Sequence, residues 1–398
     1  MLQVCMGTVY AWTYYAAEVR ERFGCSDAMA AVAFSLAIGF LGCSAVVAGR
    51  LLPRCGPRNL AVTGAVLYGA GYLLAAWALE AKWLWLFWVG FGAIGGTGLG
   101  LAYVTPVATV ARWFGRGGGA VTGLVVMGFG IGSLVMVKLV YPMLAARAGG
   151  DLTKIFLGIG VLLLPLGVLF ALFLRNPDAA PPTSGISAGP DAVVVAAEPV
   201  SPRLLVLLWL AFFLTIFVGI MFVSNQAGWF KELTVRRTPD VAAAALAASA
   251  ATVVGIASLC NAAGRLVWAA LSDAWGRVRV FRAILLVEAG VLVWLLFTRD
   301  PLLFAVANAL MLLCYGGGFG VLPSLVRDLF GLRRMPQIYG IMLTSWAAGG
   351  ILGPLLAACL QDAFGPRGMD YTLVAGLALI VLALVLSMWI RPGRAAIR

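Results

Sequence analysis

Hydrophobic stretches long enough to cross a lipid bilayer recur along almost the whole of this 398-residue chain. A membrane-spanning helix needs about 20 mostly apolar residues, and 62% of the chain is hydrophobic whereas only 11% is charged. Soluble domains carry about 25% charged residues. We therefore predict an all-α protein that crosses the bilayer many times. The twelve predicted spans cover about residues 1–17, 29–50, 59–80, 83–111, 117–142, 153–174, 204–228, 242–271, 280–298, 301–326, 336–361 and 371–390.

One long polar connection divides these spans into two groups of six. Residues 176–203 are rich in Pro, Ala, Ser and Gly, a composition that cannot bury a core and is typical of a linker. We therefore expect an N-terminal six-helix bundle over 1–175, a linker over 176–203 and a C-terminal six-helix bundle over 204–398. The first span is short, so we expect it to begin in the headgroup layer or to continue upstream of Met1.

The basic residues are concentrated on one side of the predicted membrane. The connections on the linker's side carry sixteen Lys and Arg and five acids, whereas the other side carries ten of each. Cytoplasmic loops carry an excess of Lys and Arg. The sequence thus predicts a multi-pass protein of the cell membrane with both termini and the linker in the cytoplasm. The net charge of +12 follows from this topology, so we expect no nucleic-acid partner.

The residue types that usually hold metals or cofactors are scarce. The chain has no histidine, and its seven cysteines are scattered without a CxxC pair. A membrane enzyme would need clustered histidines, cysteines or carboxylates within the spans. We therefore expect no metal, no cofactor and no enzymatic activity.

Arg265 stands inside the apolar run 253–268. A charged residue at the centre of a membrane helix costs roughly 2.5–3.5 kcal/mol even on the mildest scale, and arginine does not lose its proton in proteins. Eight residues separate Arg265 from Asp273 at the helix end, a depth of about 12 Å. The guanidinium is a planar fork of donors that matches a carboxylate. We therefore predict a carrier that moves small organic anions past Arg265.

Several polar and aromatic residues are candidates for lining the same site. Asn261 lies one helical turn from Arg265, where its amide binds either the substrate or a neighbouring helix. Tyr103 and Tyr315 stand beside Gly-rich stretches, and a phenol can donate to a carboxylate, although aromatic residues in membrane helices more often serve packing. Further candidates are Tyr10, Ser345 and Trp346.

Glu288 is the one acid inside a predicted span. An intramembrane carboxyl group is a functional candidate. It serves either as a protonatable coupling site or as a counter-ion to Arg265, and in the second case Arg265 has a structural role.

Two segments of the N-terminal half recur in the C-terminal half. Residues 49–58 and 269–279 each follow the second helix of a half, and residues 112–115 have a counterpart at 328–331. Two parallel six-helix repeats are the plan of the major facilitator superfamily, and residues 269–279 resemble its G-x-L-x-D-R-x-G-R-R signature. This resemblance implies a gating role for Asp273, Gly276 and Arg277. Pro53 replaces the acid of the first copy, so we expect only Asp273 to pair with a neighbouring helix end.

Two further motifs resemble one group within that superfamily. Residues 111–123, including Arg112, are similar to the junction of the fourth and fifth helices in the oxalate:formate antiporter and monocarboxylate transporter group. The segment from Asn261 to Arg265 resembles that group's D/N-x-x-x-R substrate motif in helix 8. The resemblance implies the major facilitator fold, with twelve helices in two pseudo-symmetric bundles, and a carboxylate substrate bound by Arg265.

The departures from this group restrict the substrate. Oxalate-type carriers bring a second cation from helix 11, whereas residues 339–349 contain no Lys or Arg. One fixed positive charge balances one carboxylate, which favours a monoanion over a dianion. Animal monocarboxylate carriers place an Asp one turn before the arginine and a Lys in helix 1. Here these positions hold Asn261 and an uncharged helix, so the usual scheme of proton coupling does not carry over directly.

These observations together predict a secondary active transporter. We expect a monomer that carries small monocarboxylates such as lactate or pyruvate by alternating access and is coupled to protons. The alternative is an anion exchanger of the oxalate/formate type. A sugar or drug carrier is a further alternative, but a sugar site would need more polar side chains within the spans.

Overall fold

The computed structural model of the chain describes residues 1–114, 118–177 and 201–391. The central part of the predicted linker and the junction residues 115–117 lie outside the described residues. The helices of the N-terminal half are α1 (Leu2–Gly7), η1 (Thr8–Ala11), α2 (Trp12–Phe23), α3 (Asp27–Ala81), α4 (Leu84–Phe87), η2 (Trp88–Gly95), α5 (Gly96–Phe114), α6 (Gly119–Val135), η3 (Met136–Val140), α7 (Tyr141–Ala148) and α8 (Leu152–Leu172).

The C-terminal half is helical throughout its described length as well. Its elements are α9 (Pro202–Arg237), α10 (Ala243–Trp275), α11 (Arg277–Phe297), α12 (Pro301–Phe330), α13 (Met335–Phe364), η4 (Gly365–Arg367) and α14 (Gly368–Met388). This confirms the predicted all-α membrane fold.

The described helices provide the twelve predicted crossings. Among the described residues, nine continuous helical segments are long and apolar enough to span a membrane, and two of them, 27–81 and 335–388, double back on themselves. The first crossing combines the short apolar segment Leu2–Ala11 with α2. Helices α2 and α9 end at Phe23 and Arg237, later than the predicted ends at 17 and 228, because polar turns extend them beyond their apolar parts.

Two glycines form equivalent turns in the two halves. The backbone of Gly56, where α3 doubles back, has φ +74°, and that of Gly276, between α10 and α11, has φ +89°. Residues with a Cβ rarely adopt this conformation, whereas glycine does so at little cost. We call the end of the molecule with these two turns and the chain ends at 177 and 201 the linker face.

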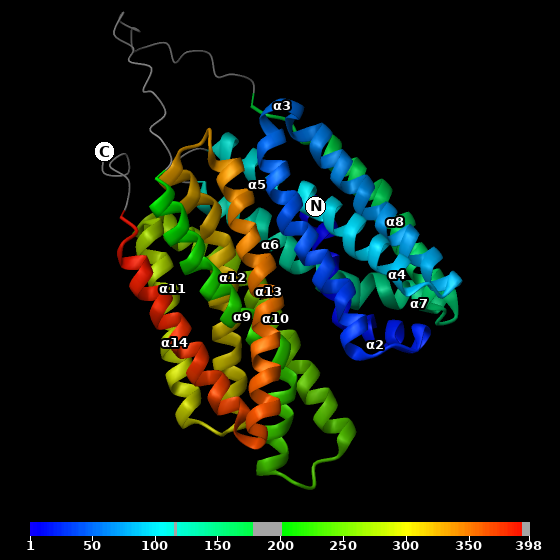
Figure 1. The fold of residues 1–398 in the computed structure, drawn as a ribbon, viewed down its shortest axis with the longest axis vertical. Coiled ribbons are helices and arrows are strands. Elements are labelled where there is room, and N and C mark those ends of the chain that lie inside the picture. The colour runs from blue at the N-terminus through cyan, green and yellow to red at the C-terminus, as the bar shows by residue number, and fades with distance from the viewer. Residues whose placement is uncertain (115–117, 178–200, 392–398) are drawn as a thin grey trace, which may run out of the picture.

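The two halves form separate groups of helices that meet mainly along two helix pairs (Figure 1). Helix α3 packs along α13, and α6 packs along α10. Glycines allow the first contact: a Cβ added to Gly340 would collide with the carbonyl oxygen of Ala45, and one added to Gly49 would collide with that of Pro336. Small residues of this kind let membrane helices approach closely.

Close contacts between the halves extend from the linker face to about the middle of the helices. They include Gly49 and Gly42 on α3, which lie against the start and the middle of α13. Toward the opposite face the two groups of helices spread apart (Figure 1), and the stretch of α10 between Ala243 and Thr252 is mostly exposed. The described conformation is therefore closed at the linker face.

Candidate functional site

Arg265 lies where α10 of the C-terminal half meets α6 of the N-terminal half. Its side chain is 0% exposed. Its Nη1 donates a hydrogen bond to the carbonyl oxygen of Val126 at 3.2 Å. Its Nε and Nη2 have no hydrogen-bond partner among the described residues. The guanidinium thus retains donors at the contact between the halves.

Two phenylalanine rings flank the guanidinium. Its Cζ lies 5.7 Å from the ring centroid of Phe129 on α6 and 5.1 Å from that of Phe319 on α12. Such cation–π contacts stabilise a cation by about 0.5–2 kcal/mol. No ion pair found within the described parts of the chain involves Arg265. Rings and one carbonyl group, rather than an acid, therefore surround the charge.

Glycines bring three helices close together around Arg265. A Cβ added to Gly320 of α12 would collide with the carbonyl oxygen of Arg265. A Cβ added to Gly130 of α6 would lie 3.1 Å from Ala262 and 3.4 Å from Nε of Arg265. The Gly-rich segments of the sequence therefore serve close helix contacts, and these contacts place Phe129 and Phe319 beside the guanidinium.

The three predicted tyrosines gather around Arg265. Tyr10 and Tyr103 pack edge-on against Phe129, at centroid distances of 5.3 and 4.9 Å, and Tyr315 packs against Phe319 at 5.3 Å. These are the two rings that flank the guanidinium. The hydroxyl groups of Tyr10 and Tyr103 are buried and lack a hydrogen-bond partner in the described structure. These tyrosines come from the first, fourth and tenth crossings, so both halves contribute to the site.

Trp346 joins this cluster, whereas the hydroxyl of Ser345 bonds within its own helix. The ring centroid of Trp346 on α13 lies 5.1 Å from that of Phe319, 5.7 Å from that of Tyr103 and 6.0 Å from that of Tyr10. The hydroxyl of Ser345 donates to the carbonyl oxygen of Met342 in its own helix. That Ser345 lines the site therefore stays a prediction, and in the described conformation its hydroxyl proton is used within α13.

Asn261 faces the contact between α10 and α12. A Cβ added to Gly316 of α12 would lie 2.8 Å from Oδ1 of Asn261. This oxygen has no hydrogen-bond partner among the residues described. Of the two expected roles, the packing role against a neighbouring helix fits this position, and the unpartnered oxygen leaves an acceptor near Arg265.

Three residues of the site were missed in the sequence. Phe129 and Phe319 each stand between two glycines, in Gly-Phe-Gly segments of α6 and α12. This shared pattern could have identified them, because the flanking glycines mark close helix contacts. Tyr339 on α13 stacks on Tyr103 at a centroid distance of 6.4 Å. It lies within the predicted helix 11, but no sequence pattern distinguishes it.

Glu288 is buried in the C-terminal half and is not seen to pair with Arg265. Its side chain on α11 is 0% exposed, and neither carboxyl oxygen has a hydrogen-bond partner among the described residues. Helix α11, which carries Glu288, packs mainly on α12 and α14 of the same half. The described residues therefore do not show Glu288 as the counter-ion of Arg265, since no ion pair among them joins the two side chains.

Asp273 connects the halves at the linker face. Its carboxylate accepts hydrogen bonds from the backbone N–H groups of Gly119 at 3.1 Å and Ala120 at 2.8 Å, at the start of α6. Negative charge is favourable at a helix N-terminus. Arg277 forms ion pairs with Asp273 and, at 3.6 Å, with Asp328. Together with the turn at Gly276, these residues make the expected contact with a neighbouring helix end.

Arg112 takes no part in this contact between the halves. Its Nη1 donates to Oδ1 of Asn176 at 2.8 Å, so the side chain lies along the end of its own bundle. Arg112 is expected to matter as part of the motif at 111–123, and a gating role for it stays a prediction.

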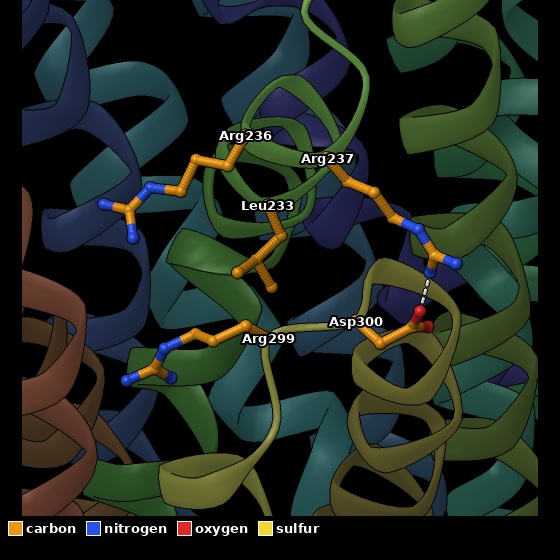
Figure 2. Close-up of a pocket in the computed structure, with 5 residues that line it drawn as sticks. All are labelled: Leu233, Arg236, Arg237, Arg299 and Asp300. Atoms are coloured by element: carbon orange, nitrogen blue, oxygen red, sulfur yellow. Dashed lines mark ion pairs between the residues drawn. The ribbon is translucent and has the colours of Figure 1, made fainter.

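A hollow with several arginines lies at the opposite face, but it does not resemble an anion site. It has a volume of about 400 Å³ and is lined by Leu233, Arg236, Arg237, Arg299 and Asp300 (Figure 2). Each arginine forms an ion pair, with Glu232, Asp300 and Asp370 respectively. Because the charges are balanced, these contacts connect the ends of the helices without leaving excess positive charge.

Comparison with known proteins identifies one matching family and several transporters of similar sequence. The sequence model described as Major Facilitator Superfamily matches residues 1–252 and 238–397. The oxalate:formate antiporter of Oxalobacter formigenes is 27% identical over 407 residues, covering 99% of this chain and 91% of that protein. Human monocarboxylate transporter 11 is 27% identical, with 91% of this chain and 75% of that protein covered. Apicoplast pyruvate carrier 1 of Toxoplasma gondii is 28% identical, with 79% and 66% covered.

Solved structures share the fold. A crystal structure of the fucose:proton symporter of E. coli superposes with a TM-score of 0.69 over 98% of both chains, at 15% sequence identity. An outward-facing bacterial homologue of the iron transporter ferroportin gives a TM-score of 0.70 over 97% of this chain and 96% of that chain, at 12% identity. At these identities the likeness shows the arrangement of the helices alone.

Proposed function

The chain belongs to the major facilitator superfamily, and we propose that it is a secondary active transporter of small monocarboxylates such as lactate and pyruvate. It is a multi-pass membrane transporter rather than an enzyme. The relatives named as a pyruvate carrier and a monocarboxylate transporter support this substrate class.

The proposal rests on the burial of Arg265 and on its unpartnered hydrogen-bond donors. Its guanidinium is fully buried at the contact between the halves, with Nε and Nη2 free of hydrogen bonds to described residues. Leaving buried donors of a charged group unpaired is costly. A carboxylate would accept from both nitrogens and neutralise the charge, and one guanidinium balances one carboxylate.

The position of Arg265 connects anion binding to alternating access. Its backbone packs on α6 and α12, and its side chain reaches Val126 and Phe129 of the other half. Enclosing a neutralised pair between the halves costs less than enclosing a lone cation. A bound carboxylate therefore favours the closed states through which the halves exchange accessibility.

Anion exchange of the oxalate/formate type is the second candidate. It is supported by the oxalate:formate antiporter, whose similarity covers 99% of this chain. Against it, helix α13 carries no basic residue beside Trp346 that could balance the second charge of oxalate.

Uptake into proteoliposomes separates the two candidates. Labelled lactate, pyruvate, formate and oxalate are offered with and without a pH gradient, to empty vesicles and to vesicles preloaded with each anion. We expect saturable uptake of lactate and pyruvate into empty vesicles, increased by an inward proton gradient, and poor uptake of oxalate. Uptake that requires a preloaded anion would instead indicate exchange, and an absence of saturable uptake for every acid would refute both.

Glu288 is the proposed site of proton coupling. An ionised carboxylate without a partner is costly in this buried position, so the neutral acid suits it. In Glu288→Gln, which mimics that neutral form, we expect normal exchange of labelled against unlabelled lactate but no increase of net uptake by a proton gradient. An undiminished increase would show that Glu288 has only a structural role.

We further propose that the linker face is cytoplasmic, that the protein lies in the cell membrane and that it works as a monomer. The orientation rests on the excess of Lys and Arg in the connections at that face.

A further inference from the structure

Tyr339 is a buried tyrosine of the C-terminal half whose ring stacks on a tyrosine of the N-terminal half. It lies in the second turn of α13 and is 0% exposed. Its hydroxyl has no hydrogen-bond partner among the described residues. Buried polar groups in proteins are nearly always hydrogen-bonded, so an exception of this kind calls for an explanation.

The surroundings of Tyr339 connect it to the guanidinium. Its ring stacks on that of Tyr103 at a centroid distance of 6.4 Å and an interplanar angle of 21°. Tyr103 in turn packs edge-on against Phe129 at a centroid distance of 4.9 Å, and Phe129 flanks the guanidinium of Arg265. The hydroxyl of Tyr103 also lacks a partner in the described structure. Two unpartnered phenols, one from each half, therefore lie together beside Arg265.

Arg265 and the two phenols together offer more hydrogen-bond donors than one carboxylate can accept in a single plane. The Nε and Nη2 atoms of Arg265 already suit the two oxygens of a carboxylate, which binds the guanidinium fork edge to edge. An unsubstituted acid such as propanoate would then turn carbon atoms toward the phenols. Their hydroxyl groups would stay unpaired, and sites built to hydrogen-bond a substrate oxygen discriminate strongly against analogues that lack it.

We propose, on the basis of the monocarboxylate function argued above, that Tyr339 determines specificity by hydrogen-bonding, together with Tyr103, an oxygen on C2 of the substrate. The transporter therefore prefers 2-oxo and 2-hydroxy monocarboxylates to unsubstituted acids of the same length. Because Tyr103 belongs to α5 and Tyr339 to α13, the same oxygen also connects the two halves when they close around the substrate.

Competition by three acids of equal length tests this assignment. Pyruvate, lactate and propanoate compete against labelled lactate in proteoliposomes with the unaltered protein and with Tyr339→Phe, which removes only the hydroxyl. The loss of one hydrogen bond should raise the inhibition constants of pyruvate and lactate roughly threefold to tenfold. The constant for propanoate should stay unchanged. Tyr103→Phe should give the same pattern.

Tyr371→Phe is the matched control, because Tyr371 is 41% exposed and stacks on Phe364 away from the site. It should leave all three constants unchanged. An equal change for all three acids in Tyr339→Phe, or no change for any, would overturn the specificity role. Arg265→Gln is measured in parallel. If Arg265→Gln transports lactate normally, the proposed carboxylate site itself is wrong. If Arg265→Gln loses transport but Tyr339→Phe keeps the selectivity of the unaltered protein, only the role of Tyr339 is refuted.

Discussion

Replacing Arg265 with glutamine is expected to abolish saturable uptake of lactate and pyruvate while the protein stays folded. Glutamine keeps a polar side chain but removes the charge and the fork of donors that remain free at Nε and Nη2. Each hydrogen bond to a charged group contributes about 1.5–3 kcal/mol. The loss of two such bonds corresponds to a roughly hundredfold or greater fall in affinity. Initial rates of uptake into proteoliposomes measure the effect.

Two further variants serve as controls for this experiment. Arg265→Lys keeps the charge but loses the planar fork, so uptake should persist with a raised KM. Arg203→Gln removes an arginine that lies over the ring of Trp389 at 5.6 Å, away from the site, and should transport normally. The thermal unfolding midpoint of Arg265→Gln should not fall, because the variant removes a buried charge that has no acidic partner in the described structure. Normal uptake by Arg265→Gln would contradict the proposal.

Replacing Gly340 with valine is expected to prevent closure at the linker face. A Cβ at this position would collide with the carbonyl oxygen of Ala45 on α3, so the two halves must separate there. Overpacking of this kind costs about 1–3 kcal/mol, which shifts a two-state equilibrium by roughly 5-fold to 150-fold. Spin labels at Arg58 and Arg333 report the change as longer distances between the halves, and uptake should fall because one of the alternating states is disfavoured.

Gly290→Val is the matched control for this experiment. Gly290 lies on α11, and a Cβ added there has no described neighbour within 4 Å. The same increase in volume should therefore leave distances and uptake unchanged. If Gly340→Val keeps the distance distribution of the unaltered protein, the contact between α3 and α13 is not a gate.

Features that depend on the composition of the chain could be predicted from the sequence. The twelve crossings followed from apolar runs of sufficient length, and Arg265 was identified because a charge in such a run needs a reason. Asp273 was identified through a loop motif whose carboxylate meets the start of α6. In each case the hydrophobicity or charge of a single segment or residue indicates its role, and no knowledge of its neighbours in the fold is needed.

Features that depend on how helix faces meet could not be predicted. Phe129 and Phe319 flank the guanidinium because glycines on α6 and α12 bring those helices close to α10. The direction of the Ser345 hydroxyl is set by a hydrogen bond within α13. Tyr339 matters because of its stacking on Tyr103 from the other half, and no local pattern records contacts between segments more than 200 residues apart.

The most direct test of the central claim is to locate a bound carboxylate. The purified protein is crystallised with 2-bromopropanoate, and the bromine is found from its anomalous scattering. We predict the carboxylate at Nε and Nη2 of Arg265, with the guanidinium still between the rings of Phe129 and Phe319. A ligand bound elsewhere, with Arg265 paired to an acid of the protein, would contradict the account.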